Sequence, residues 1–358
     1  MSRRSCIILG AGGLVGQRLQ QRLINHPNFE IKAIAGSKDS SGKSLTEIDW
    51  KLEQNRPNLP ELIILDLNDE NFIKTVISLG IKIAFSALPD YIASIIEVKL
   101  SDAGITVFSN SNANRRKKAI PLVIPEVNPN HLYKTPKKIF CATNCTLLPV
   151  AIPLAAIYEE IQIEQIKMHS EQALSGAGWR LLFDEEALKG NLQTLIDGEA
   201  EKVSLELLHV FGQLKDQEVA SASFTTDFEC RRVSRANGHQ VFVEITTRKP
   251  VNIEKIKHQF KHFYPFEGYL NTPSSPFNPI HMVDSIDTKA HLWSDGKVFS
   301  DKPNPSKDLK TGMAIVVGDI ECIDEHKFRF SAYSHNTIRG AAGGVVLLAE
   351  LALMNSLI

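Results

Sequence analysis

Short apolar runs alternate with amphipathic stretches in the first third of the chain. Residues Ser5–Leu9 form an apolar run of strand length, and a glycine-rich segment follows it. Leu19 and Leu23 then recur at helical spacing, and a His-Pro pair at 26–27 ends that stretch before a second apolar run at Phe29–Ala35. A strand, a turn, a helix and a strand within about 35 residues match the length of one βαβ unit.

Further apolar runs continue this alternation, at Leu62–Leu65, Ile83–Ser86 and Ile105–Ser109. Strands that are separated by helical stretches usually pair in parallel, with helices on both faces of the sheet. We therefore predict an α/β fold whose first domain is a Rossmann-type, doubly wound parallel sheet.

The pattern changes after Cys145. Two stretches have helical periodicity, Ala151–Glu160 and Glu199–Val210. Later runs alternate or stay apolar as strands do, at Val241–Thr247, Met313–Ile320 and Phe328–Ser334. Strands that are not separated by regular helices indicate an α+β domain with a mostly antiparallel sheet.

Two features mark the end of the chain. Asn271–Lys310 is rich in Pro, Ser, Asn and Asp, which predicts a long loop region. Gly340–Leu353 begins with small residues and continues with apolar ones. We expect it to form a buried helix that returns to the first domain.

Length and composition limit the function classes. The chain has 358 residues, 43% of them hydrophobic, which fits two packed domains. Its net charge is -1, so the charge balance gives no reason to expect nucleic acid or an anionic membrane as a partner. The basic run Arg115–Lys118 is typical of a solvated loop. No apolar run reaches the ~18 residues of a membrane span.

The 5 cysteines are scattered along the chain without the spacing of a metal site or a disulfide framework. We therefore expect no bound metal and a cytoplasmic location.

The glycine turn after the first strand favours a dinucleotide cofactor. Gly10, Gly13 and Gly16 lie between a predicted strand and a predicted helix, where backbone N–H groups can hold a diphosphate. The second strand ends in Ser37-Lys38, which suits a 2′-phosphate and hence NADP over NAD. The neighbouring Asp39 weakens that choice, and Lys38 could instead cap a surface turn.

Cys145 is a candidate nucleophile. Lys138–Ala142 is predicted to be a strand, and residues 143–146 are predicted to open a helix. A thiol at a helix N-terminus would have a lowered pKa, and nearby N–H groups could hold an oxyanion. The alternative is that Cys145 is a small buried apolar residue.

A base is the next requirement, and His239 is the candidate. It follows an Asn-Gly turn and stands seven residues after Arg232. A histidine there could titrate near neutral pH, although most single histidines are structural or solvated.

Taken together, these segments resemble the aspartate-β-semialdehyde dehydrogenases, most closely the archaeal and fungal members. The resemblance covers nearly the whole chain. It rests on Gly10–Gln17, Phe85–Pro89, Ser109-Asn110 with Arg115, Pro121–Asn128, Asn144–Thr146, Gln172–Gly178, Arg232 with His239, Gly312-Met313 and His335–Gly343.

The resemblance implies a reaction, the NADPH-dependent reduction of L-aspartyl 4-phosphate to L-aspartate 4-semialdehyde. It lies on the route to lysine, threonine, methionine and isoleucine. Cys145 would form a thioester, His239 would be the general acid–base residue, Gln172 would orient the acyl group, and Asn144 would help to hold the oxyanion.

The same resemblance implies the binding residues. Arg232 would bind the α-carboxylate, Glu206 the α-ammonium and Arg115 the phosphate. His209 stands where the family usually has a phosphate-binding lysine, so its contribution would depend on pH. The implied cofactor site consists of Gly10, Gly12, Gly13, Leu14, Val15, Ser37, Lys38, Ser86, Ala87, Leu88, Pro89, Ser175, Gly176 and Asn336.

The resemblance also implies an organisation. Residues 1–144 and 336–358 would form the NADP-binding domain, and 145–335 the catalytic and dimerisation domain of a homodimer or homotetramer. One alternative is an acyl-CoA reductase, such as a malonyl-CoA reductase, with the same catalytic residues. An N-acetylglutamyl-phosphate reductase fits less well, and a weakly active NADP-binding paralogue is the alternative from another class.

Overall fold

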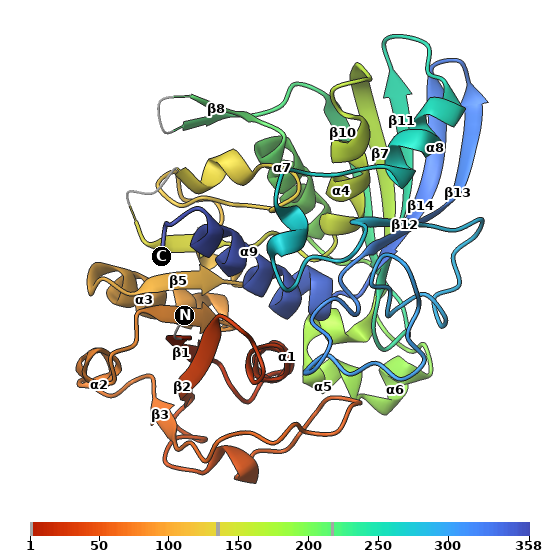
Figure 1. Cartoon of the computed structure of the whole chain (residues 1–358). Coiled ribbons are helices and arrows are strands. Elements are labelled where there is room, and N and C mark those ends of the chain that lie inside the picture. Colours follow the sequence, from red (N-terminus) through yellow and green to blue (C-terminus); the bar gives the residue numbers. More distant parts are fainter. Residues whose placement is uncertain (1–2, 134–136, 216–217) are drawn as a thin grey trace.

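A computed structural model describes residues 3–133, 137–215 and 218–358, which form two six-stranded sheets and one two-stranded sheet with helices packed around them (Figure 1). The first sheet has the strand order β3-β2-β1-β4-β5-β6, and every neighbouring pair is parallel. Its strands are β1 (Arg4–Leu9), β2 (Phe29–Gly36), β3 (Ile64–Asp66), β4 (Ile83–Ser86), β5 (Thr106–Ser109) and β6 (Ile139–Cys141). The predicted doubly wound sheet is confirmed.

The order of the first sheet reverses between β1 and β4. Ligands of open α/β sheets bind in the crevice outside the carboxyl ends of the strands at such a point. The connecting helices are α1 (Leu14–Leu23), α2 (Phe72–Ser78) and α3 (Asp90–Asp102). Ile7, Ile8 and Leu9 of β1 are fully buried, as expected for a central strand covered on both faces.

The second sheet has the order β10-β7-β11-β14-β13-β12. Its strands are β7 (Ile163–Gln172), β10 (Thr225–Arg232), β11 (His239–Thr247), β12 (Ile280–Met282), β13 (Ile315–Asp324) and β14 (Lys327–Ser334). The inner pairs are antiparallel and the two outermost pairs parallel, so the predicted mostly antiparallel sheet is confirmed.

Helices cover one face of the second sheet. Helices α4 (Leu148–Ile157) and α8 (Ile253–Lys261) contact each other and this sheet, while α7 (Glu199–Val210) packs against β10. Short elements complete the domain: α5 (Trp179–Leu182), α6 (Glu185–Leu188), β8 (Gln213–Lys215) and β9 (Glu218–Ala220).

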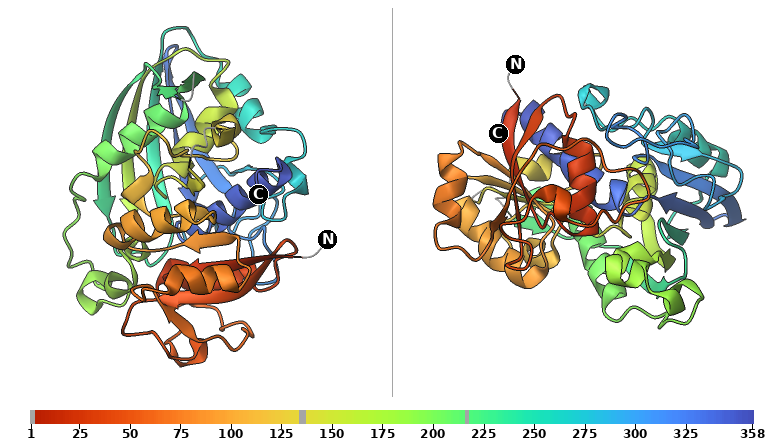
Figure 2. Two further views of the ribbon diagram at one scale, coloured as in Figure 1. Left: turned by 90° about the vertical axis from the view of Figure 1, so that its left-hand side faces the viewer. Right: turned by 90° about the horizontal axis from the view of Figure 1, so that it is seen from below.

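The end of the chain returns to the first domain, as predicted. A π-helical turn, Ile338–Ala342, leads into α9 (Gly343–Met354), which packs against α1 and β5. Figure 2 shows this segment beside the first sheet. The same segment therefore links β14 of the second sheet to the cofactor-binding side of the molecule.

The long loop between α8 and β13 also joins the two domains. Trp293 lies under the Arg18 guanidinium of α1, 5.4 Å from its ring centre, and its ring is 4.2 Å from that of His335. Phe299 stacks between His281 and His291, with ring centres 4.2 and 4.3 Å away. Residues 286–299 thus form a packed bridge. Across residues 3–133, 137–215 and 218–358, no helix is long and apolar enough to cross a membrane.

Candidate active site

A cavity of about 280 Å³ lies where the two domains meet. Both domains and the segment before α9 contribute to its wall. Nine of the predicted site residues line it: Val15, Arg115, Asn144, Cys145, Gln172, Ser175, Gly176, Arg232 and Asn336. We call it the Cys145 cavity.

Cys145 lies in a turn and not in the first turn of a helix. Residues 145–147 form that turn, and α4 begins only at Leu148. The predicted helix start was wrong, and so was the predicted direction of the thiol's pKa. Burial, followed by the nearby Glu199 carboxylate, raises the pKa of Cys145 to about 11, although Arg115 and Arg232 act in the opposite direction.

Gly340 fixes the position of the thiol from the opposite side. A Cβ atom at Gly340 would lie 2.6 Å from the Cβ atom of Cys145, so this position has no room for a side chain. The glycine before α9 therefore leaves space for Cys145.

His239 is buried at the start of β11 and does not line the Cys145 cavity, but its ring packs against Gly176, which does. Its Nδ1 atom accepts a hydrogen bond from the Ala173 N–H at 3.0 Å. Burial and the charges of Arg232 and Arg235 lower the pKa of His239 to about 3. The neutral ring therefore carries its proton on Nε2, a buried atom without a hydrogen-bond partner among the described residues.

Gln172 and Arg232 end two neighbouring strands. They are directly paired in the parallel register of β7 and β10, so both side chains reach the same edge of the sheet. The Nη1 atom of Arg232 donates to the Ala173 carbonyl at 2.8 Å. Gln172 is 2% exposed, and its Nε2 donates to the Ser170 hydroxyl at 3.4 Å.

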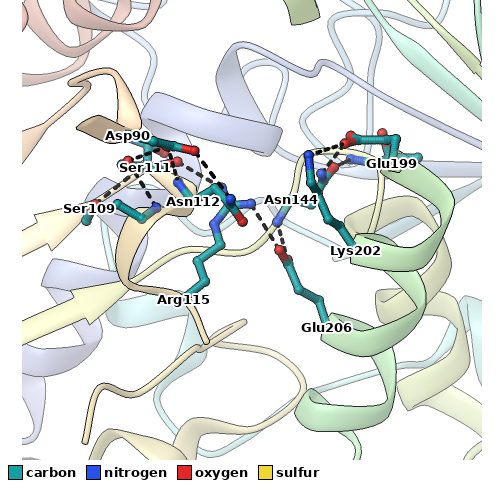
Figure 3. Close-up of polar contacts among 12 residues, drawn as sticks. Asp90, Ser109, Ser111, Asn112, Arg115, Asn144, Glu199, Lys202 and Glu206 are labelled. Atoms are coloured by element: carbon teal, nitrogen blue, oxygen red, sulfur yellow. Dashed lines mark hydrogen bonds and ion pairs between the residues drawn. The ribbon is translucent and has the colours of Figure 1, made fainter. Parts of the chain in front are cut away.

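Arg115, Glu206 and Asn144 form one hydrogen-bonded group (Figure 3). One oxygen of Glu206 accepts from Arg115 Nη1 at 3.1 Å, and the other accepts from the Asn144 N–H at 2.6 Å. Burial alone would lower the pKa of Arg115, but the negative charges around it, mainly that of Glu206, outweigh this and raise it.

Glu206 and His209 face a second cavity, of about 380 Å³, on the other side of Arg115. It is also lined by Arg116, Lys117 and Lys118, and we call it the basic cavity. The His209 ring lies edge-on to His131, with ring centres 5.9 Å apart. The fold thus places Arg115 on both cavities but does not bring His209 to the wall around Cys145.

Glu199 is a site residue that the sequence analysis did not identify. It is the first residue of α7, two helical turns before Glu206, and it lines the Cys145 cavity. Its Oε1 atom accepts from Asn144 Nδ2 at 2.7 Å. The helical spacing from Glu206 was the available signal, because residues two turns apart share one helix face.

The predicted cofactor residues follow the carboxyl ends of β1, β2 and β4. Gly10 has a φ of 84°, and a Cβ atom at Gly16 would lie 2.1 Å from the Gly10 carbonyl oxygen. The turn from β1 into α1 therefore requires glycine at both positions. Ser37 and Lys38 are exposed directly after β2.

A second group of predicted cofactor residues, Ser86–Pro89, lies next to this turn. The Ala87 N–H donates to the Leu9 carbonyl at 3.0 Å, beside Gly10. The remaining residues link the crevice to the Cys145 cavity. Asn336 Nδ2 donates to the Ser175 hydroxyl at 2.9 Å, and its Oδ1 accepts from the Gly238 N–H at 2.8 Å.

A glycine turn at the switch point of a parallel sheet, next to a cavity between two domains, is typical of one class of protein, the dinucleotide-dependent enzymes. Comparison with known families gives the particular member. Residues 5–135 match the model "Semialdehyde dehydrogenase, NAD binding domain", and residues 154–339 match "Semialdehyde dehydrogenase, dimerisation domain". The chain belongs to the semialdehyde dehydrogenase family.

Known relatives span the whole chain. An aspartate-semialdehyde dehydrogenase of Archaeoglobus fulgidus is 32% identical over 99% of this chain and 100% of that protein. A malonyl CoA reductase (NADP) of Metallosphaera sedula is 31% identical over 96% of this chain and 95% of that protein. The crystal structure of the Candida albicans aspartate-semialdehyde dehydrogenase with NADP has a TM-score of 0.82 at 27% identity, covering 100% of both chains.

Proposed function

We propose that the protein is an NADP-dependent aspartate-semialdehyde dehydrogenase, which reduces L-aspartyl 4-phosphate to L-aspartate 4-semialdehyde and releases phosphate. One observation carries the proposal: a single small cavity combines Cys145 with the cations Arg115 and Arg232 and the carboxylate of Glu199. Such a wall complements a substrate with two anionic groups, one ammonium group and an electrophilic carbon. The archaeal and fungal relatives support the assignment.

NADPH fits the crevice at the carboxyl ends of β1 and β2. The glycine turn presents backbone N–H groups toward a diphosphate, and Ser37 with Lys38 suits a 2′-phosphate. When bound, the cofactor supplies the hydride. Ser175, Gly176 and Asn336 border the Cys145 cavity, so they would hold the nicotinamide end beside the reacting carbon.

The chemistry begins at the Cys145 sulfur. Its thiolate attacks the acyl carbon of the substrate, the bond to the phosphate oxygen breaks, and a thioester forms as phosphate leaves. After hydride addition, the thiohemiacetal collapses to the aldehyde and restores the thiolate. Arg115 is the proposed phosphate ligand, and Arg232 the proposed ligand of the α-carboxylate, with a planar fork suited to two oxygens.

His239 is the proposed general acid–base residue. Because the proton of the neutral ring resides on Nε2, that N–H can donate a hydrogen bond to the oxygen of the reacting carbonyl and stabilise the negative charge that develops there until the aldehyde forms. Gln172 would orient the acyl group from the adjacent strand. Asn144 would act mainly by position, because its N–H and its Nδ2 already bind Glu206 and Glu199.

We further propose that residues 1–144 with 336–358 act as the cofactor-binding unit and 145–335 as the catalytic unit of a homodimer. The uncovered face of the second sheet is the proposed interface. It contains a groove of about 1000 Å³ lined by residues such as Lys167, His169, Glu244 and Arg329, with Phe242 38% exposed. A tetramer would be a dimer of such dimers.

A cytoplasmic location is also proposed. Its support is that all 5 cysteines of the chain lie in the described segments and carry free thiols.

Malonyl-CoA reduction is the second candidate, favoured by the similarity to the reductase of Metallosphaera sedula. The cavity itself argues for an amino-acid head group, because malonyl-CoA has no cation for Glu199. His209 stands where the family usually has a lysine, and this residue lines the basic cavity.

The test is the reverse reaction of the purified protein with L-aspartate semialdehyde, phosphate and NADP, followed by NADPH absorbance. NAD replaces NADP in a parallel sample, and malonyl-CoA with NADPH is assayed separately. Phosphate-dependent NADPH formation is expected. Oxidation of NADPH by malonyl-CoA, with no turnover of the semialdehyde, would replace the proposed substrate by a CoA thioester.

A further inference from the structure

The proposed phosphate ligand, Arg115, extends from a turn that follows β5. We call residues 110–115 the Arg115 turn. Ser111 caps its short helix with its hydroxyl oxygen, and the Arg115 N–H donates to the Asn112 carbonyl at 3.3 Å. Nη2 of Arg115 donates back to the Asn110 carbonyl at 2.8 Å. The position of the guanidinium therefore depends on how this turn is held.

Glu97 of α3 holds the Arg115 turn from the core. It is fully buried, and its two oxygens accept from the Ser109 hydroxyl at 2.7 Å and from Asn114 Nδ2 at 2.6 Å. These partners lie at the end of β5 and directly before Arg115. Replacing Glu97 would leave buried polar groups without partners, so this contact is part of the fold.

Asp90 of α3 holds the same turn from the solvent side. It is the first residue of the helix and is exposed. Its Oδ1 atom accepts from the Ser111 hydroxyl at 2.7 Å and from the Asn112 N–H at 3.0 Å, and its Oδ2 accepts from Asn112 Nδ2 at 3.3 Å (Figure 3). A carboxylate in the first turn of a helix often does no more than interact with the helix dipole. Here both of its oxygens bind the Arg115 turn.

The contacts of Asp90 are charge-assisted. Burial alone would raise the pKa of Asp90, but the hydrogen bonds from Ser111 and Asn112 and the charge of Arg115 outweigh this and lower it. Hydrogen bonds to an ionised carboxylate are roughly twice as strong as those between neutral groups. Asp90 therefore fixes the start of the short helix that ends at Arg115.

Arg115 keeps a donor for an anion. Its Nη1 and Nη2 atoms bind Glu206 and the Asn110 carbonyl, but its buried Nε atom has no hydrogen-bond partner among the described residues. A guanidinium is a planar fork, so it binds two oxygens of an anion only in a narrow range of orientations. A small displacement of the Arg115 turn would therefore weaken phosphate binding before it affected the rest of the site.

We propose that Asp90 is a positioning residue, which orients Arg115 and thereby sets the affinity of the enzyme for phosphate without touching the substrate. This inference rests on the proposed function, in which Arg115 is the phosphate ligand. Glu97 maintains the fold around the turn, whereas Asp90 sets the direction of the guanidinium.

The experiment measures the reverse reaction of the Asp90→Asn variant over a range of phosphate concentrations. Asparagine keeps the size of the side chain but removes its charge. The KM for phosphate should rise by about 5- to 20-fold, the effect of weakening charge-assisted hydrogen bonds. The values of kcat and of the KM for L-aspartate semialdehyde should change by less than about 2-fold. A merely structural role would lower kcat and raise both KM values together.

Asp102→Asn is the matched control, because Asp102 is the last residue of α3 and its replacement removes the same charge and a surface ion pair with Lys137. It should leave all three values unchanged. Ser111→Ala removes a partner of Asp90 from the turn. Because the two residues act through one contact, the double variant should have a KM for phosphate no higher than that of the more impaired single variant.

A KM for phosphate in Asp90→Asn equal to that of the wild type would overturn the inference, and so would an equal effect on kcat and both KM values. Effects of Asp90→Asn and Ser111→Ala that multiply in the double variant would also contradict it. Should Asp90→Asn fail to fold, judged by NADPH binding, Ser111→Ala alone is expected to raise the KM for phosphate, and an unchanged value there would overturn the inference.

Failure of the inference differs from failure of the proposed function. If the wild-type protein does not turn over L-aspartate semialdehyde with phosphate, both are overturned. If the wild type does so, and Asp90→Asn keeps the wild-type KM for phosphate, only the assignment of Asp90 is overturned.

Discussion

The Cys145 cavity and the basic cavity are neighbours with different chemistry. Arg115 borders both, and its ion pair with the buried Glu206 closes the wall between them. The Cys145 cavity contains a thiol and several amides beside its charged groups, whereas the described wall of the basic cavity has no thiol and holds more cations than carboxylates: Arg115, Arg116, Lys117 and Lys118 against Glu206 and Glu218. Under the proposed function, this difference assigns recognition of the whole substrate to the Cys145 cavity, and the basic cavity would act on the phosphate only through Arg115.

Removal of the nucleophile should have the largest effect. Cys145→Ala is expected to abolish turnover in both directions, because no thioester can form. NADPH binding should persist, since Cys145 contributes no part of the glycine turn. Cys322→Ala is the control, because Cys322 is exposed on β13. More than a trace of activity in Cys145→Ala would refute the thioester mechanism.

The second-largest loss of activity is expected when His239 is replaced. His239→Asn should lower kcat by about 10²–10⁴-fold, the usual contribution of general acid–base catalysis. The amide can still accept from the Ala173 N–H, so the loss would reflect proton transfer and not the fold. His258→Asn, an exposed histidine of α8, is the control. A rate equal to that of the wild type would remove His239 from the chemistry.

The third-largest loss of activity is expected when Glu206, which lies between the two cavities, is replaced. Glu206→Gln weakens the ion pair with Arg115 and the acceptor for the Asn144 N–H. We expect a loss of roughly 10- to 100-fold in kcat/KM, the effect of a lost charge-assisted hydrogen bond. Glu201→Gln, which removes the same charge at an exposed position of α7, should leave kcat/KM unchanged. A kcat/KM of Glu206→Gln equal to that of the wild type would contradict the role of this ion pair.

The reactivity of the thiol gives a smaller, pH-dependent effect. Because burial and Glu199 raise the pKa of Cys145 to about 11, the rate of alkylation by iodoacetamide should still be rising at pH 9 in the free enzyme. Removing the Glu199 charge lowers that pKa, so Glu199→Gln should be alkylated several-fold faster at pH 8. Arg115 and Arg232, the cations that act on the thiol, are unchanged in this variant. Slower alkylation of the variant would contradict the assigned geometry.

The smallest effect is expected for His209. If it supports the phosphate contact of Arg115, His209→Ala should raise the KM for phosphate a few-fold at constant pH and leave kcat unchanged. His209→Lys should keep a low KM for phosphate. A KM for phosphate in His209→Ala equal to that of the wild type would limit the phosphate site to Arg115.

Much of the first domain was predictable from sequence, because local signals there agree with the tertiary fold. The run Ser5–Leu9 is the core of β1, and the glycine pattern reflects positions where backbone atoms leave no room for a Cβ atom. The limits of α7 also match the predicted Glu199–Val210. By contrast, β7 and β10 were not predicted. Charged and polar residues at their solvent-facing positions alternate with buried residues, so neither strand contains a long apolar run.

The residues of the site could be predicted from the sequence, but the pKa shift of the Cys145 thiol could not. Local sequence signals identified Cys145 and His239 as candidates, and the family resemblance added Gln172 and Arg232. The fold places Cys145, Gln172 and Arg232 on one cavity, with the His239 ring against Gly176. The direction of the thiol's pKa shift depends on burial and on the approach of α7, which no local pattern encodes. For the same reason, Glu199 and Glu206 could not be distinguished until the fold placed them in different cavities.

The most direct test is mass spectrometry of the protein after mixing with L-aspartate semialdehyde and NADP in the absence of phosphate. The thiolate adds to the aldehyde, NADP accepts the hydride, and without phosphate the aspartyl thioester should remain on the enzyme. We expect one aspartyl adduct on the peptide that contains Cys145, and its loss when phosphate is added. No adduct despite NADPH formation, or an adduct on another cysteine, would contradict it.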